Sequence, residues 1–201
     1  MKISIIDYGA GNLPSVEGAL SKLGAETRLA TQPADVASAK ALVLPGVGHF
    51  AAFVNGLREN NLAEPLRAAF DSGVPILGIC LGLQAMFESS EEAPGEPGLG
   101  FLPGKVRALP RNVKSPHIGW NQLREVQTGQ LLRGVSPNAY FYFAHSFAAP
   151  AESASTAAAC DHGLAFAAVV EQRNLFAVQF HPEKSGEAGA QVLRNFVEAV
   201  E

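Results

Sequence analysis

Cys80 is the residue of this sequence best suited by its surroundings to act as a nucleophile. It lies in Gly78-Ile79-Cys80-Leu81-Gly82, between an apolar segment typical of a buried strand and a segment, 84–88, that predicts a helix. A sharp strand-to-helix turn strains the nucleophile's backbone, and flanking glycines let the chain approach closely. A helix N-terminus favours a thiolate, and the N–H of Leu81 would point toward a substrate oxyanion. The alternative is a buried core cysteine, and this motif alone leaves the two interpretations even.

His181 and Glu183 form the second candidate group, two positions apart at the end of a predicted strand. Side chains at i and i+2 of an extended segment face the same side, and Pro182 stiffens that geometry. A carboxylate orients an imidazole, and the imidazole activates a thiol. A surface histidine beside a solvated carboxylate is the favoured interpretation of His-Pro-Glu alone. Together with the Cys80 turn, the pattern favours catalysis.

Two glycine-rich turns offer backbone N–H groups at strand ends. Residues 45–48 follow a predicted strand at 41–44, at the strand end where open α/β sheets carry their sites, and can supply the second half of an oxyanion hole. They lack the Gly-Lys-Ser/Thr ending of a phosphate loop. Gly9-Ala10-Gly11 suggests a dinucleotide site, but Pro14 stands in place of the third glycine. We therefore expect a tight β-to-α turn there.

Strands and helices alternate along the first half, which predicts an α/β fold with an open, mostly parallel, twisted sheet and helices on both faces. The expected strands there are 2–7, 27–30, 41–44 and 74–79, and the expected helices are 15–23 and 55–72. After Glu92 the pattern becomes one of short strands and turns. We expect an antiparallel extension of the sheet from strands at 106–109, 120–126, 139–147 and 155–160. A hairpin of 165–171 and 175–180 and a helix at 187–200 complete the chain.

Composition and charge exclude several classes of function. The 201 residues fit a single domain over 1–201, with 47% hydrophobic and 17% charged residues. The net charge of −4 gives no basic surface for nucleic acid. No apolar run approaches the roughly 20 residues of a membrane span, and we see no signal peptide, so we expect a cytoplasmic protein. Two distant cysteines predict neither a disulfide nor a cysteine zinc site, and we expect no cofactor or metal.

Five motifs in order resemble a known family. Residues 45–48 (Pro-Gly-Val-Gly), 78–84 (Gly-Ile-Cys-Leu-Gly-Leu-Gln) and 179–185 (Gln-Phe-His-Pro-Glu-Lys-Ser) are similar to those of class I glutamine amidotransferases. Residues 116–121 (Pro-His-Ile-Gly-Trp-Asn) and 140–147 (Tyr-Phe-Tyr-Phe-Ala-His-Ser-Phe) resemble the glutaminase subunits of imidazole glycerol phosphate synthase in histidine biosynthesis. The resemblance runs nearly end to end and implies a flavodoxin-like fold.

The resemblance also implies roles for individual residues. Cys80 would attack the amide of glutamine, His181 would protonate the leaving ammonia and then activate water, and Glu183 would hold His181. The oxyanion hole would comprise the N–H groups of Leu81, Val47 and Gly48. The residues matching glutamine-binding positions are Gly46, Gln84, Glu92, His145, Ser146 and Phe147. Those matching the partner interface are Asn12, Tyr142 and Lys184.

The partner implied by the resemblance is a (β/α)8-barrel cyclase, which would receive the ammonia and would bind the phosphorylated substrate. The sequence departs from the family at Pro14, where arginine is frequent, and at Phe147, where tyrosine is common. We therefore expect no polar partner contact from Pro14 and only a backbone contact from Phe147.

Other functions remain as alternatives. They are an amidotransferase subunit of another pathway, a non-catalytic thiol sensor on the same fold, and a cysteine peptidase. Residues 116–121 favour histidine biosynthesis, and a sensor needs no base with an orienting carboxylate. His49, His117 and His162 have no metal-ligand spacing and are expected to be surface or structural residues. Cys160 is expected to pack in a strand, and Trp120 is expected to be a packing anchor and not a substrate contact.

Overall fold

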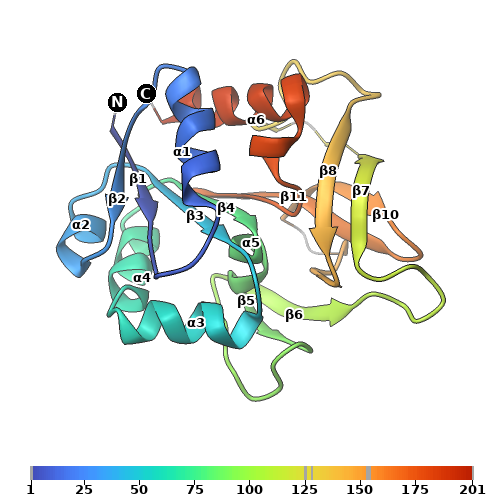
Figure 1. Ribbon diagram of the computed structural model, residues 1–201, viewed down its shortest axis with the longest axis horizontal. Coiled ribbons are helices and arrows are strands. Elements are labelled where there is room, and N and C mark those ends of the chain that lie inside the picture. Colours follow the sequence, from blue (N-terminus) through green and yellow to red (C-terminus); the bar gives the residue numbers. More distant parts are fainter. Residues whose placement is uncertain (1, 125, 128, 153–154, 201) are drawn as a thin grey trace.

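A seven-stranded sheet forms the centre of the computed structural model, which describes residues 2–124, 126–127, 129–152 and 155–200. The strand order is β10-β11-β12-β4-β3-β1-β2 (Figure 1). Its parallel strands are β1 (Lys2–Ile6), β2 (Glu26–Ala30), β3 (Leu42–Gly46), β4 (Ile76–Cys80) and β12 (Leu175–Val178). The strands β10 (Thr156–Asp161) and β11 (Ala165–Gln172) extend it in antiparallel fashion. The predicted α/β class, with its mostly parallel sheet, is confirmed.

Helices cover both faces of this sheet. The helices α1 (Leu13–Lys22) and α6 (Gly186–Ala199) contribute to one core, and α2 (Pro33–Ala37), α3 (Phe50–Glu59), α4 (Ala63–Asp71) and α5 (Leu81–Ala85) contribute to the other (Figure 1). Neighbouring strand residues alternate between the two, as a sheet buried on both faces requires: Leu42 and Leu44 join one core and Val43 the other. Within the described residues, every helix falls short of the length and apolar character that a membrane crossing needs.

Two helix predictions were wrong in extent. The single helix expected over 55–72 is two helices, α3 and α4, because the chain turns through Asn61 in a left-handed conformation with φ 56°. The helix after Cys80 has five residues and ends at Ala85. Phe87 then begins strand β5 (Phe87–Ser90), where its fully buried ring joins the core. Burial against the sheet therefore outweighs local helix propensity at Phe87.

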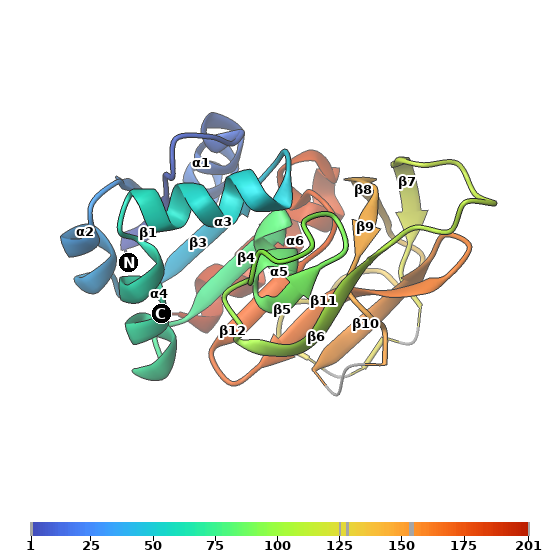
Figure 2. The same cartoon turned by 90° about the horizontal axis from the view of Figure 1, so that it is seen from below.

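Most of the strands expected in the antiparallel extension form separate small sheets (Figure 2). Of the four expected after residue 105, only β10 joins the central sheet. The others are β6 (Leu102–Ala108), which pairs with β5 and β9 (Phe147–Ala148), and β7 (His117–Gln122), which pairs with β8 (Tyr140–His145). The strand expected at 120–126 therefore begins earlier and ends at Gln122, and residue 125 lies outside the described residues. The predicted final hairpin is confirmed as β11 and β12.

Candidate active site

Cys80 occupies the sharp turn that the glycine spacing predicts. It ends β4 and precedes α5, with φ 55° and ψ −107°, a conformation that L-residues rarely adopt. A residue held in such a region stores about 1–3 kcal/mol of strain. The glycine at 82 is required sterically, since a Cβ there would lie 1.9 Å from the carbonyl oxygen of Leu44. The β3 backbone thus packs directly against the turn and keeps it in place.

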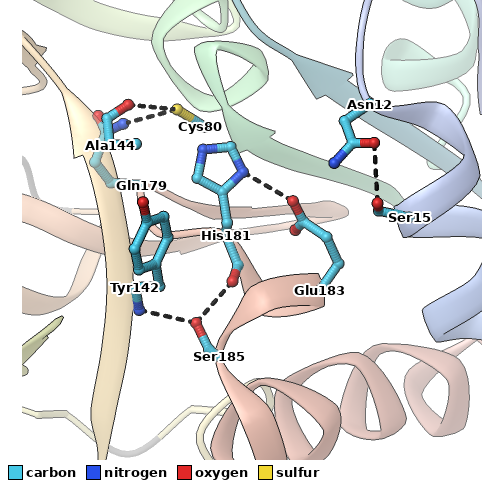
Figure 3. Close-up of polar contacts among 9 residues, drawn as sticks. All are labelled: Asn12, Ser15, Cys80, Tyr142, Ala144, Gln179, His181, Glu183 and Ser185. Atoms are coloured by element: carbon cyan, nitrogen blue, oxygen red, sulfur yellow. Dashed lines mark hydrogen bonds and ion pairs between the residues drawn. The ribbon is translucent and has the colours of Figure 1, made fainter. Parts of the chain in front are cut away.

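The imidazole of His181 lies between the Cys80 sulfur and the Glu183 carboxylate (Figure 3). Its Nδ1 is 2.9 Å from Oε1 of Glu183, and the two side chains are 6% and 1% exposed. Burial alone lowers the pKa of His181, but hydrogen bonding to Cys80 and Glu183 outweighs it and raises that pKa to about 10. The site therefore favours the protonated, imidazolium form of His181.

His181 and Glu183 meet through a backbone conformation that differs from the extended one expected from the sequence. The strand β12 ends at Val178, and residues Pro182–Lys184 form a short 3₁₀ helix, η1. Glu183 therefore reaches the ring of His181 across a tight turn, where an extended segment had been expected. The hydroxyl of Ser185 fixes this turn by donating to the carbonyl of His181 at 2.7 Å.

Two groups that contact the Cys80 sulfur were missed by sequence reasoning. The side-chain amide of Gln179 donates to the sulfur at 3.6 Å, and the thiol faces the carbonyl oxygen of Ala144 at 3.8 Å (Figure 3). Gln179 stands two positions before His181 within the third motif, which was the available signal for it. Ala144 acts through its main chain, so its residue type gave no signal.

A cleft of about 330 Å³ opens beside Cys80 and His181. Most of the residues expected at the substrate and oxyanion sites line it. They are Val47, Gly48, Leu81, Gln84, Glu92, His145, Ser146 and Phe147, with Lys184 from the expected interface. Pro116, Ile118 and Ala144 also line the cleft, without having been singled out. Glu183, Gly46 and Asn12 instead line a cavity of about 10 Å³ behind the imidazole.

The expected oxyanion donors differ in how they are engaged. Leu81 is the first residue of α5 and lines the cleft. The N–H of Val47 points instead at the phenol oxygen of Tyr8, 3.5 Å away, and the same phenol lies 3.4 Å from the Val47 carbonyl. Burial raises the pKa of Tyr8, so the phenol stays protonated. In this structure the Val47 amide is thus engaged by the phenol of Tyr8.

Glu92 has one oxygen committed to the fold. Its Oε2 accepts from the N–H of Phe50 at 2.8 Å, at the start of α3. This hydrogen bond connects Glu92, which lines the cleft, to the start of α3, directly after the glycine-rich segment 45–48. His49, whose ring caps α3 through the N–H of Ala51, is a structural residue, as expected.

His117 and His145 form a buried hydrogen-bonded pair behind the cleft. Nδ1 of His145 lies 2.9 Å from the carbonyl oxygen of Phe147, and its Nε2 lies 3.0 Å from Nδ1 of His117. Burial lowers the pKa of His145 to about 3 and that of His117 to about 4. His162 stacks on His117 with ring centroids 4.1 Å apart. The neutral ring of His145 thus supports Phe147, which lines the cleft.

The remaining cysteine is separate from this chemistry. Cys160 is fully buried in β10, as expected, and burial raises its pKa to about 12. In the part of the chain that the structure describes, no group of three or more His, Cys, Asp or Glu side chains is arranged to hold a metal ion.

The β7–β8 ribbon exposes apolar side chains beside the cleft. Trp120 is 55% exposed, so its expected role in packing is wrong; Ile118 and Tyr140 are also exposed. Tyr142 stacks edge-on against Trp120, and the ammonium of Lys184 lies 5.8 Å above the Tyr142 ring. The ring pair and this ammonium thus form a continuous surface at the cleft mouth. Asn12 lies apart, on the other side of His181 and Glu183, where its side chain accepts a hydrogen bond from Ser15 (Figure 3).

The comparisons with known proteins agree with one another on the family. The profile of the family described as "Glutamine amidotransferase class-I" matches residues 4–200. The chain is 48% identical over 201 residues to "Imidazole glycerol phosphate synthase subunit HisH" of Methanothermobacter thermautotrophicus, covering 98% of each chain. It is 46% identical over 199 residues to the protein of the same name from Moorella thermoacetica, covering 98% of this chain and 95% of that one.

Solved structures share the fold at low sequence identity. A structure described as a glutamine amidotransferase superposes with a TM-score of 0.78 at 20% identity, covering 98% of each chain. PurLQS from Thermotoga maritima gives a TM-score of 0.74 at 18% identity, covering 100% of this chain and 99% of that one. These likenesses support the overall fold described above.

Proposed function

This chain belongs to the class I glutamine amidotransferases, and we propose that it hydrolyses the side-chain amide of glutamine and supplies the ammonia to a cyclase subunit in histidine biosynthesis. The observation that carries the proposal is that Cys80 and His181 line one cleft while Glu183 contacts the imidazole of His181 from behind. The names of its relatives, which are subunits of imidazole glycerol phosphate synthase, supply the pathway.

The chemistry follows from the positions of these side chains. The thiolate of Cys80 attacks the amide carbon of glutamine, and the carbonyl oxygen becomes an oxyanion beside the N–H of Leu81. The imidazolium of His181 gives its proton to the departing nitrogen, the C–N bond breaks, and a thioester forms. His181 then takes a proton from water as the water attacks the thioester. Glutamate leaves as the C–S bond breaks, and the thiolate of Cys80 and the imidazolium of His181 are restored, while Glu183 holds the ring throughout.

The oxyanion hole would be completed by the glycine-rich loop. We propose that Val47 and Gly48 contribute N–H groups once the contact between Val47 and Tyr8 is released. This makes the Tyr8 contact a feature of the resting enzyme and predicts a low rate for the free subunit. Gly46, Gln84, Glu92 and the segment 145–147 would then bind the rest of the glutamine molecule.

The partner is proposed to be a (β/α)8-barrel cyclase that docks over the mouth of the cleft. The exposed ring of Trp120 and the half-buried ring of Tyr142, with Lys184 beside them, support docking at this surface, because aromatic residues are enriched in protein interfaces. Asn12 is proposed to contribute from the opposite side of His181. Ammonia released beside His181 would pass to the barrel without entering bulk water.

The proposal treats residues 1–201 as one domain that works in the cytoplasm. Support comes from a single central sheet shared by both cores and from a family match that spans residues 4–200. A non-catalytic thiol sensor is disfavoured, because a sensor does not need the buried carboxylate of Glu183 against its histidine.

The deciding experiment measures glutamate released from glutamine by the chain alone and with a cyclase barrel and its nucleotide ligand. Partner-dependent release that is abolished by Cys80→Ala and retained by Cys160→Ala is the expected result. If the release of glutamate does not depend on the cyclase, the chain is still a glutaminase but its partner is a different protein. No release in any combination would overturn the proposal.

A further inference from the structure

Gln179 lies at the base of the active site with its side chain fully enclosed. It follows the end of β12, and its relative exposure is 0%. A buried amide requires hydrogen-bond partners, and Gln179 finds them in two other side chains of the site. Its Nε2 lies 3.6 Å from the sulfur of Cys80, and its Oε1 lies 3.0 Å from Nε2 of Gln84.

The direction of this chain of amides is fixed by a main-chain carbonyl. Nε2 of Gln84 lies 2.7 Å from the carbonyl oxygen of Phe147, which can only accept. The second N–H of that same amide donates to Oε1 of Gln179. The amide nitrogen of Gln179 is then the group that faces Cys80, so the sulfur meets a hydrogen-bond donor. An N–H donor stabilises a thiolate more than a thiol.

The same bonds determine what Gln84 offers to a ligand. Both of its N–H groups are engaged, one with Phe147 and one with Gln179. Gln84 lines the cleft, so its amide oxygen is the group that remains to accept a hydrogen bond from a ligand there. An acceptor at this point suits a ligand that carries N–H groups, as glutamine does, and disfavours an approaching carboxylate.

We propose that Gln179 has two roles, as a hydrogen-bond donor to the reactive thiolate of Cys80 and as the positioning residue that orients Gln84 toward glutamine. The second role rests on the proposed glutaminase function, whereas the first concerns the thiol alone. Because the two contacts use opposite ends of one amide, single substitutions can separate them.

Two variants of the full chain make this separation. Gln179→Glu keeps an acceptor for the N–H of Gln84 but removes the donor to Cys80. Gln179→Met has a similar volume and removes both. The matched control is Asn195→Leu, which also deletes a buried amide, one that donates to the carbonyls of Leu131 and Arg133.

The first measurement is the rate of Cys80 alkylation by iodoacetamide against pH, with the modified residue identified by peptide mass. Both Gln179 variants should react about tenfold more slowly at pH 7, with the rise in rate displaced to higher pH, because a thiolate loses a charge-assisted hydrogen bond. Asn195→Leu should react as the wild-type chain does, even where its melting temperature falls. Unchanged alkylation in a folded Gln179→Glu chain would overturn the donor role, whether or not Gln179→Met folds.

The second measurement is the KM and kcat for glutamine in the complex with the cyclase. Gln179→Glu should lower kcat with little change in KM, and Gln179→Met should lower kcat and raise KM. Equal KM values in both variants would overturn the positioning role. If the wild-type complex hydrolyses no glutamine while alkylation responds as expected, the proposed function fails and the donor role stands.

Discussion

The backbone N–H of His181 donates to the carbonyl oxygen of Tyr142 at 2.9 Å. The main chain of the active-site histidine is therefore bonded to the β7–β8 ribbon, which carries the exposed aromatic surface. The hydroxyl of Ser185 accepts from the N–H of Tyr142 at 3.0 Å and donates to the carbonyl of His181 (Figure 3). Three hydrogen bonds therefore connect the cleft mouth to the proposed base. A protein docking on this ribbon contacts the element that positions His181.

Trp120→Ala is expected to weaken binding of the cyclase by about 30-fold in Kd, because a central aromatic residue in an interface contributes about 2 kcal/mol. The Trp120 side chain is 55% exposed in the free chain, so the free energy of unfolding should change little. Isothermal titration calorimetry measures the affinity. Leu29→Ala is the control, because Leu29 is 43% exposed on β2, an edge strand of the central sheet, to which β7 does not belong. Equal affinities for both variants would assign the interface elsewhere.

Glu183→Gln is expected to lower kcat for glutamine by at least about 100-fold with little effect on KM, because the amide can still contact His181 but carries no charge to stabilise the imidazolium. Steady-state kinetics of the complex measure this change. Glu187→Gln, an exposed change in the first turn of α6, is the control and should leave both constants unchanged. A kcat within threefold of wild type, a difference of about 0.6 kcal/mol in activation free energy, would show that Glu183 has no role in the mechanism.

His117 and His145 should remain uncharged down to about pH 5, because burial lowers their pKa values to about 4 and about 3. The unfolded chain takes up these protons near pH 6.5, so unfolding binds protons and stability falls as pH drops below that value. The loss is about 1.4 kcal/mol per pH unit for each proton withheld. Carbon chemical shifts of labelled imidazoles, with urea unfolding at pH 7, 6 and 5, test this. Titration of both rings near 6.5 would contradict it.

The pH dependence of stability has the opposite sign at His181. Burial lowers its pKa, but its bonds to Cys80 and Glu183 outweigh burial and raise the pKa to about 10. Its contribution to stability is complete below pH 6.5 and is lost as pH rises toward 10. The same spectra should therefore show the imidazole of His181 still protonated at pH 7.5. In Glu183→Gln this resonance should titrate at lower pH.

Gly82→Ala is expected to destabilise the chain by about 3 kcal/mol or more, since the new Cβ would lie 1.9 Å from the carbonyl oxygen of Leu44 and backbone must move. Gly18→Ala is the matched control in α1, where a Cβ would meet nothing within 4 Å. That change should stabilise the chain by about 0.5–1 kcal/mol, because alanine favours a helix interior. Urea denaturation of both variants measures the difference, and an equal stability for both would refute the steric argument.

The sequence predicted the features that depend on local backbone chemistry. The glycines on either side of Cys80 indicated the strained turn, and the alternation of strands and helices indicated the sheet. The turn at Asn61 and the short helix after Cys80 were missed, because they depend on how the segments pack against distant strands. The part played by Gln179 was missed for a related reason, since its partner Gln84 is 95 positions away in the chain.

Trp120 shows the limit of arguments from residue type. An aromatic ring in a strand is usually buried, but β7 belongs to a two-stranded ribbon with one face open, and Trp120 lies on that face. Glu183 shows the opposite case, in which the expected contact with His181 formed through a 3₁₀ turn. The contact between His181 and Glu183 was predicted correctly although the backbone conformation was not, because two residues on either side of a proline can meet in more than one conformation.

The pairing of β12 with β4 also has a consequence for synthesis of the protein. Leu175 lies beside Ile76 in the interior of the sheet, so β12 leaves the ribosome long after β4, the strand that it pairs with. Contacts of such large sequence separation are slow to form, because loop closure must precede them. A nascent chain that ends before β12 has Cys80 but neither His181 nor the strand that completes its sheet. Reactive chemistry at the thiol is thereby deferred until His181 has been synthesised and β12 has paired with β4.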